Sequence, residues 1–141
     1  RLIVAALLLP IACADPAFAQ KRETLKPDQI RGAYVAPKEA KFTQMYENLR
    51  ELKVLERARE LLSPLNAALT IKLEGCDGVA NAWYEEDTVT ICYEYLDFIV
   101  QSAPGKGDGP KGTTEKSALV GPFVDVTLHE IGHAVFDILQ V

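Results

Sequence analysis

The sequence predicts an α+β domain with an N-terminal helix, a small three-stranded sheet that includes a hairpin, and a helix near its C-terminal end. Three observations support this fold class. Apolar residues recur at helical spacing over 42–55 and 123–139, they alternate with polar residues over 69–74, and turn residues separate two further short strands. With 141 residues, 48% of them apolar, the chain is long enough for one core of ordinary size. We therefore expect one folded domain.

The first 19 residues are almost entirely apolar and form a segment of a different kind. An apolar run that is broken by Pro10 and followed by small residues around Phe18 is typical of a secretory signal with an A-x-A cleavage site. We expect cleavage after Ala19, which leaves 20–141 as the mature domain. A lipoprotein signal ending at Cys13 is the alternative, whereas a transmembrane anchor needs about 20 uninterrupted apolar residues.

The net charge and the predicted signal limit which partners the chain can have and where it is located. With 15 Lys+Arg against 20 Asp+Glu the net charge is −5, and no basic cluster is present for a nucleic-acid backbone. We expect a secreted or periplasmic protein without a nucleic-acid partner and, once the signal is removed, without a membrane anchor. Because the sequence lacks a starting Met and stops at Val141 within a helical pattern, we also expect a fragment of a longer chain.

The mature domain is expected to begin with an extended polar lead-in over 20–36, followed by one long helix. Pro37 suits the first turn of a helix. The residues that recur at the spacing of one helix face are Phe42, Met45, Tyr46, Leu49, Leu52 and Leu55. The helix should end near Leu62, before Ser63-Pro64.

Three strands are expected after this helix. Residues 69–74 alternate apolar and polar side chains, which predicts a half-buried strand. After a turn at Cys76-Asp77-Gly78, the segments 79–84 and 88–92 read as two strands around an acidic turn, which predicts a hairpin.

Two helices complete the predicted domain. Residues 93–100 predict a short helix with Leu96, Ile99 and Val100 facing the core, and the Gly- and Pro-rich segment 101–117 predicts a surface loop. From Pro122 onward the pattern is helical again. The apolar face of this last helix comprises Phe123, Val124, Leu128, Ile131, Val135, Ile138 and Leu139.

The mature domain retains two cysteines, Cys76 and Cys92. A disulfide persists outside the cytosol, so we expect them to pair and to close a loop that the chain-entropy model values at about 3 kcal/mol. Two buried free thiols are an alternative. Two metal thiolates are a poorer one, because no Cys-x-x-Cys spacing is present.

The last predicted helix carries the two histidines of the sequence, in the order His129-Glu130-Ile131-Gly132-His133. A four-residue step places both imidazoles on one side of a helix, about 6 Å apart along its axis, where both can bind one zinc ion at about 2.0–2.1 Å. Glu130, one step round the helix, is placed to act as general base on a water at that ion. The alternative is two core histidines bonded to carbonyl groups, with Glu130 in an ion pair.

Two histidines are one ligand short of a catalytic zinc site, which takes three ligands from protein. Asp137 lies one turn beyond His133, but ligands on three successive turns span about 12 Å, so we expect Asp137 to support the site or to be solvated. Phe136 and Leu139 stand where the extended H-E-x-x-H-x-x-G-x-x-H pattern has Gly and His. We therefore expect the third ligand after Val141, and the fragment by itself to be inactive.

Several features of residues 65–141 occur together in a known order: Cys76, then Asn81-Ala82-Trp83-Tyr84, then Ile91-Cys92-Tyr93-Glu94, and then Phe123 to Leu139 with its H-E-x-x-H motif. In this order the chain resembles a secreted bacterial family of metallopeptidases of the zincin type. The resemblance implies a zincin-like fold, a zinc cofactor and a peptide or protein substrate. It also implies a Glu and Asp pair, of gluzincin type, shortly after the segment that corresponds to Leu139.

By the same resemblance, strand 79–84 or strand 88–92 is the sheet edge beside the cleft, where a peptide substrate adds as an extra strand. Asn81 and Tyr84 are candidate contacts with that substrate, and a structural role is the alternative for both. The sequence thus predicts a secreted zinc metallopeptidase that hydrolyses peptide bonds with Glu130 as general base. The alternatives are a non-catalytic zincin-like envelope module that binds a metal or a partner, and a disulfide-stapled domain without metal.

Overall fold

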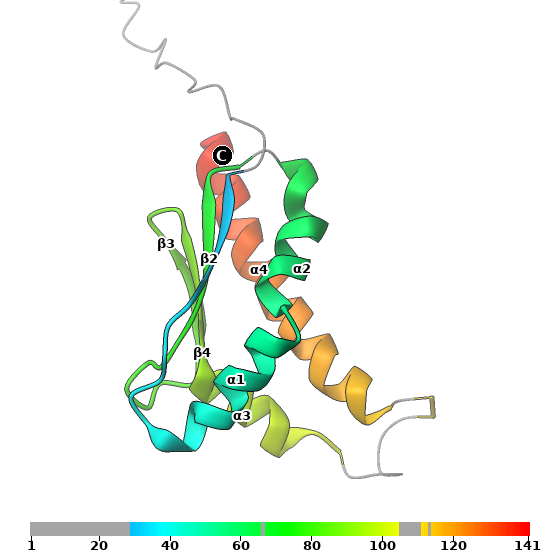
Figure 1. Cartoon of the computed structure of the whole chain (residues 1–141). Helices are drawn as coiled ribbons and strands as arrows, with labels where there is room; N and C mark the ends of the chain where they lie inside the picture. The colour runs from blue at the N-terminus through cyan, green and yellow to red at the C-terminus, as the bar shows by residue number, and fades with distance from the viewer. Residues whose placement is uncertain (1–28, 66, 105–110, 113) are drawn as a thin grey trace, which may run out of the picture.

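The computed structural model describes residues 29–65, 67–104, 111–112 and 114–141. The predicted signal over 1–19 and Cys13 lie outside these residues. Within the described part, the chain forms an α+β fold in which helices cover one face of a four-stranded sheet (Figure 1). The predicted α+β class is confirmed, but the prediction of three strands is wrong. In the same part of the chain, no helix combines the length and apolar character needed to cross a membrane.

The sheet is mixed and has the strand order β1-β2-β4-β3. The strands are β1 (Ile30–Tyr34), β2 (Leu69–Glu74), β3 (Ala82–Glu85) and β4 (Thr88–Cys92). β2 pairs in parallel with both β1 and β4, whereas β3 pairs antiparallel with β4 at one edge. The predicted hairpin is confirmed, although its first strand covers Ala82–Glu85 and not 79–84. Its turn residues Glu86 and Asp87 have φ values of 44° and 60°. Positive φ at both central residues is typical of type I′ hairpin turns, whose twist matches that of the strands.

The strand that the sequence did not predict is β1, which lies in the segment expected to be an extended lead-in. Its residues show no two-residue alternation, and only Ile30 among them is buried. Pairing with β2 makes this segment a strand, with Ile30 opposite Leu69. At Gly32 a Cβ atom would lie 2.9 Å from the Cβ of Leu55, so glycine lets α2 approach the strand closely.

The long helix predicted over 37–62 is divided into shorter elements. They are a 3₁₀ turn η2 (Ala40–Phe42), α1 (Thr43–Glu51), α2 (Val54–Leu62) and a second 3₁₀ turn η3 (Ser63–Leu65). The chain turns at Lys53, whose φ of 52° and ψ of 47° are left-handed. The Tyr34 hydroxyl accepts a hydrogen bond from the backbone N–H of Leu55 at 2.8 Å and donates one to Glu56 at 2.8 Å. Because the group that caps α2 comes from β1, apolar spacing alone did not reveal the break.

Two further helices follow the hairpin. They are α3 (Tyr93–Ser102) and α4 (Glu115–Leu139). The short helix is confirmed, although Val100 is exposed and does not face the core as predicted. α4 begins before Pro122, which lies inside the helix, so the predicted loop is shorter than expected. The reason is a capping box, in which Thr114 and Ser117 each accept a hydrogen bond from the backbone N–H of the other.

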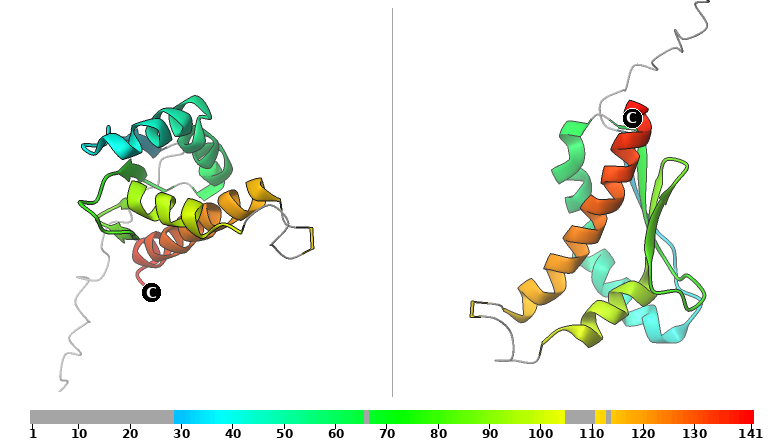
Figure 2. Two further views of the ribbon diagram at one scale, coloured as in Figure 1. Left: turned by 90° about the horizontal axis from the view of Figure 1, so that it is seen from below. Right: turned by 180° about the vertical axis from the view of Figure 1, so that it is seen from behind.

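The core lies between the sheet and the helices (Figure 2). α2 packs against β1, and α4 packs against β3 and β4. Alternate residues of β2 (Leu69, Ile71 and Leu73) are buried on this face, together with Ile131 and Ala134 of α4. The sheet therefore holds one side of α4 in place and leaves the opposite side free for the histidines.

Candidate metal centre

His129 and His133 lie on the side of α4 that faces away from the core, and both are exposed. Their Nε2 atoms are 3.2 Å apart, and their ring centroids are 4.9 Å apart. Two nitrogens that each lie about 2.0–2.1 Å from one tetrahedral zinc ion are about 3.3–3.4 Å apart, so the pair fits a shared ion. The alternative of two core histidines bonded to carbonyl groups is wrong, because the rings are exposed and contact each other.

Glu130 lies on a different side of the same helix and is only 8% exposed. One residue step rotates a helix by about 100°, which carries the chain from the exposed His129 to the buried Glu130. The carboxylate therefore belongs to the boundary between the histidine pair and the core. No ion pair among the described residues includes Glu130, so the predicted alternative of a structural ion pair has no support there.

The histidine pair has no third metal ligand in the described part of the chain. There, no His, Cys, Asp or Glu forms a group of three ligand atoms with His129 and His133 within a mutual 4.8 Å. Two imidazole nitrogens provide two of the three protein ligands that a catalytic zinc takes. A third ligand after Val141 stays a prediction.

Cys76 and Cys92 form a disulfide, with an S–S distance of 2.01 Å and a Cα–Cα distance of 5.5 Å. The bond joins the turn after β2 to the end of β4. The alternatives of free thiols and of metal thiolates are therefore wrong. Although both sulfur atoms lie within 4.8 Å of the Glu94 carboxylate, this group is not a metal site, because a metal ligand must be a thiolate.

Glu94 is a buried carboxylate whose role the sequence did not reveal. Its oxygens accept hydrogen bonds from the backbone N–H of Cys76 at 2.9 and 3.0 Å and of Gly78 at 3.0 Å. Burial alone would raise the pKa of Glu94, but the N–H groups of Gly78 and Cys76 outweigh it, so the pKa lies below its usual range. Asp77 and Gly78 have positive φ values of 51° and 92°, which is typical of a turn. The Asp-Gly pair is therefore the sequence feature that indicates a turn here, but it does not show that Glu94 binds that turn.

The edge strand β3 lies beside α4 and is joined to it by a side-chain hydrogen bond. The Tyr84 hydroxyl donates to the Asp137 carboxylate at 2.8 Å. Burial, followed by this hydrogen bond, raises the pKa of Tyr84 to about 12. Asn81 is exposed next to the other end of β3, where its backbone carbonyl accepts from the N–H of Cys92. Tyr84 thus connects the sheet edge to α4 one turn beyond His133.

The model of a protein family with the description "Putative metallopeptidase" matches residues 34–141. The match covers more than half of the chain, and the chain therefore belongs to this family. No curated protein and no solved structure matches the chain. The predicted family is confirmed, and its description points to metal-dependent peptidases as the class of protein.

Proposed function

We propose that this chain contains the zinc-binding helix of a metallopeptidase that hydrolyses peptide bonds, and that His129 and His133 bind the zinc. The observation that carries the proposal is the 3.2 Å separation of their Nε2 atoms on the exposed side of α4, in a member of a metallopeptidase family. Zinc, when bound, activates a water and polarises the scissile carbonyl. Residues after Val141 supply the third ligand, and the chain up to Val141 is inactive by itself.

In this proposal Glu130 is the general base. It neighbours His129 in the sequence and lies at the edge of the core, where its carboxylate is held largely away from bulk water. Glu130 takes the proton of the attacking water and delivers it to the leaving amine, the two proton transfers that peptide hydrolysis needs. Asp137, already bonded to Tyr84, holds the edge strand beside the helix and is not a ligand.

The substrate in this proposal is a peptide or protein segment that adds to β3. This strand forms one edge of the sheet, so an extended chain can pair with its free backbone groups. The hydrogen bond from Tyr84 to Asp137 holds that edge next to the helix that carries the histidines. Asn81 and Tyr84 are the candidate side-chain contacts with the substrate.

We also propose that the protein is secreted or periplasmic, with residues 1–19 removed as a signal. The disulfide between Cys76 and Cys92 supports this location, because such bonds persist in oxidising compartments.

The first test is zinc stoichiometry, measured by elemental analysis on the signal-free protein with the residues that follow Val141. We expect one zinc per chain in the wild type, its loss in His133→Ala, and its retention in Asp125→Ala, a matched control at an exposed position of α4. Equal zinc in His133→Ala and wild type contradicts the proposed ligand. Absence of zinc in the wild type contradicts the metal site and favours a structural domain.

The second test separates catalysis from metal binding. Glu130→Gln is expected to retain zinc and to lower kcat/KM for a peptide library by at least about 100-fold, because the general base is lost. Unchanged hydrolysis in this variant overturns the role of Glu130. Zinc binding without any hydrolysis by the wild type indicates the non-catalytic module instead.

A further inference from the structure

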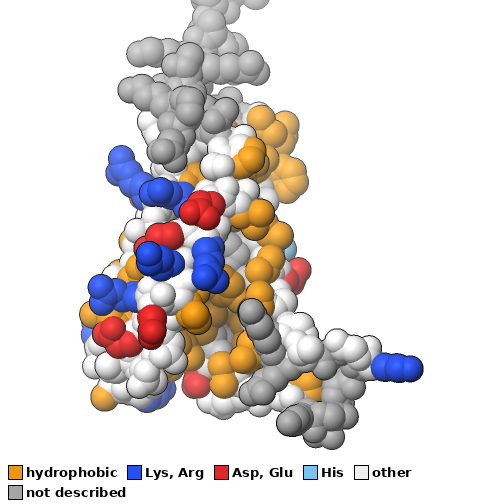
Figure 3. Space-filling view, turned by 45° about the vertical axis from the view of Figure 1, so that its right-hand side comes forward, with side chains coloured by type: hydrophobic (Ala, Val, Ile, Leu, Met, Phe, Trp, Pro, Cys, Tyr) orange, Lys and Arg blue, Asp and Glu red, His pale blue; other side chains and the backbone are white. Residues whose placement is uncertain are grey.

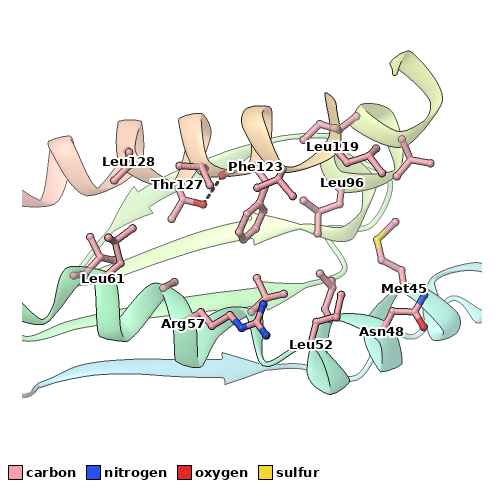
Figure 4. Close-up of a pocket in the computed structure, with 18 residues that line it drawn as sticks. Met45, Asn48, Leu52, Arg57, Leu61, Leu96, Leu119, Phe123, Thr127 and Leu128 are labelled. Carbon is pink, nitrogen blue, oxygen red and sulfur yellow. Dashed lines mark hydrogen bonds between the residues drawn. The ribbon is translucent and has the colours of Figure 1, made fainter. Parts of the chain in front are cut away.

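A groove of about 800 Å³ runs between α2 and α4, on the helical side of the molecule. α1 and α3 contribute to its walls (Figure 4). The groove is separate from the histidine pair, because neither His129 nor His133 lines it. Its volume lies within the range of about 300–1,000 Å³ that is typical of small-molecule sites.

The walls of the groove are aliphatic and uncovered. Its exposed members include Leu52, Leu61, Val100, Val120, Val124 and Leu128. Leu61, near the end of α2, is 68% exposed, and Leu52, just after α1, is 55% exposed although its spacing in the sequence predicts burial. Figure 3 shows hydrophobic side chains gathered in a band on this side of the molecule, with both basic and acidic side chains beside it. Contiguous apolar surface of this kind marks a binding site.

One cation lies at the edge of this apolar space. Arg57 is the charged residue among those that line the groove; it is exposed, and its side chain runs along α2 at the edge of the space between the helices (Figure 4). Within the described residues no carboxylate lies within 4.0 Å of its guanidinium. Of the polar lining residues, Thr127 already donates to the carbonyl of Phe123 at 2.7 Å and the Oδ1 of Asn48 already accepts from Gln44 at 2.8 Å, which leaves the guanidinium of Arg57 to meet an anionic ligand.

We propose that the groove binds a free long-chain fatty acid, with the carboxylate on Arg57 and the acyl chain along the aliphatic walls. A guanidinium matches a carboxylate in charge and in bidentate geometry. The acyl chain needs no hydrogen-bond partners, and the aliphatic walls of the groove offer none. An apolar helix face also fits such walls, but the guanidinium of Arg57 is matched by the carboxylate at one end of an acyl chain.

Calorimetric titration with dodecanoate below its micelle concentration tests the proposal. We expect saturable binding of one ligand per chain, which tightens by roughly tenfold for each two methylenes added to the acid. Arg57→Gln should weaken binding by roughly tenfold or more, while Arg59→Gln, on the same helix outside the groove, should not change it. Leu61→Glu should abolish binding, and Leu65→Glu, an exposed leucine outside the groove, should leave it intact.

Several results would overturn the proposal. They are an absence of saturable binding, equal losses in each variant and its control, and equally tight binding of dodecanol, which lacks the carboxylate. Binding only to anionic lipid vesicles would indicate a membrane surface. Loss of binding when residues after Val141 are present would show that the chain itself covers the groove.

Discussion

The two sides of α4 that flank the histidine pair are packed in different ways. On the sheet side, Ile131 and Ala134 are buried and Asp137 accepts a hydrogen bond from Tyr84. On the side that faces α2, Val120 and Leu128 remain exposed although they are equally apolar. The helix is thus anchored firmly by one side only.

Through this difference, α4 can meet two separate requirements, a rigid support for metal ligands and an uncovered apolar surface. Metal ligands have to be held in a fixed geometry, and the packing of α4 on the sheet provides a rigid support for His129 and His133. An apolar groove for a ligand needs uncovered surface, which the side that faces α2 retains. The comparison predicts that substitutions on the sheet side affect stability far more than substitutions on the groove side.

The largest expected effect is on the packing of α4. Ile131→Ala should lower the free energy of unfolding by about 2–5 kcal/mol, because it leaves a cavity in the core. Leu128→Ala removes a side chain that is 47% exposed and should cost less than about 1 kcal/mol. Urea unfolding of both variants measures the difference. Equal losses would show that the two sides of the helix are packed alike.

The disulfide is expected to have the next largest effect. Replacing both Cys76 and Cys92 by alanine removes a cross-link between residues 16 positions apart and should lower the free energy of unfolding by about 3 kcal/mol. The wild type should lose a similar amount when unfolded in the presence of a reductant. A variant that stays less stable than the reduced wild type would show that packing of the sulfurs, and not the cross-link, matters.

The buried carboxylate of Glu94, in the first turn of α3, predicts that the free energy of unfolding depends on pH. Glu94→Gln should cost about 1–2 kcal/mol at neutral pH, because charge-assisted hydrogen bonds to the turn are weakened. The pKa of Glu94 is lowered from its usual 4.5, so its stabilisation is present above that pH and is lost as the pH falls through the folded-state value. Unfolding curves of both proteins should therefore converge in acid. Glu85→Gln, at an exposed carboxylate, should show no such convergence.

The smallest expected effect concerns the bond between the edge strand and α4. Tyr84→Phe should lower the free energy of unfolding by about 1 kcal/mol, the net contribution of one partly exposed hydrogen bond. A double-mutant cycle with Asp137→Asn measures the coupling, which should be about 0.5–1 kcal/mol. Strictly additive losses would mean that the two side chains do not interact in solution.

Local patterns in the sequence predicted much of this fold and its candidate site. The alternation over 69–74 predicted β2, the acidic turn predicted the hairpin, and the H-E-x-x-H spacing placed two histidines on one helix. Each of these depends on residues that are close in the sequence, so their periodicity carries the information.

Other features depend on contacts between distant residues, and the sequence did not reveal them. β1 is a strand because β2 lies beside it, and the helical chain turns at Lys53 where Tyr34 of β1 meets the start of α2. An amphipathic pattern shows that a helix has an apolar side, but it does not show how much of that side a neighbour covers.

The sequence by itself determined the family, the two cysteines that pair, and a histidine pair at helical spacing, because all three are properties of residue type and order. Only the tertiary structure decided which side of α4 is anchored, that Glu130 is buried while His129 is exposed, and that Arg57 borders an open groove. The physical reason is that burial and partner choice depend on how separate elements pack, which local periodicity does not specify.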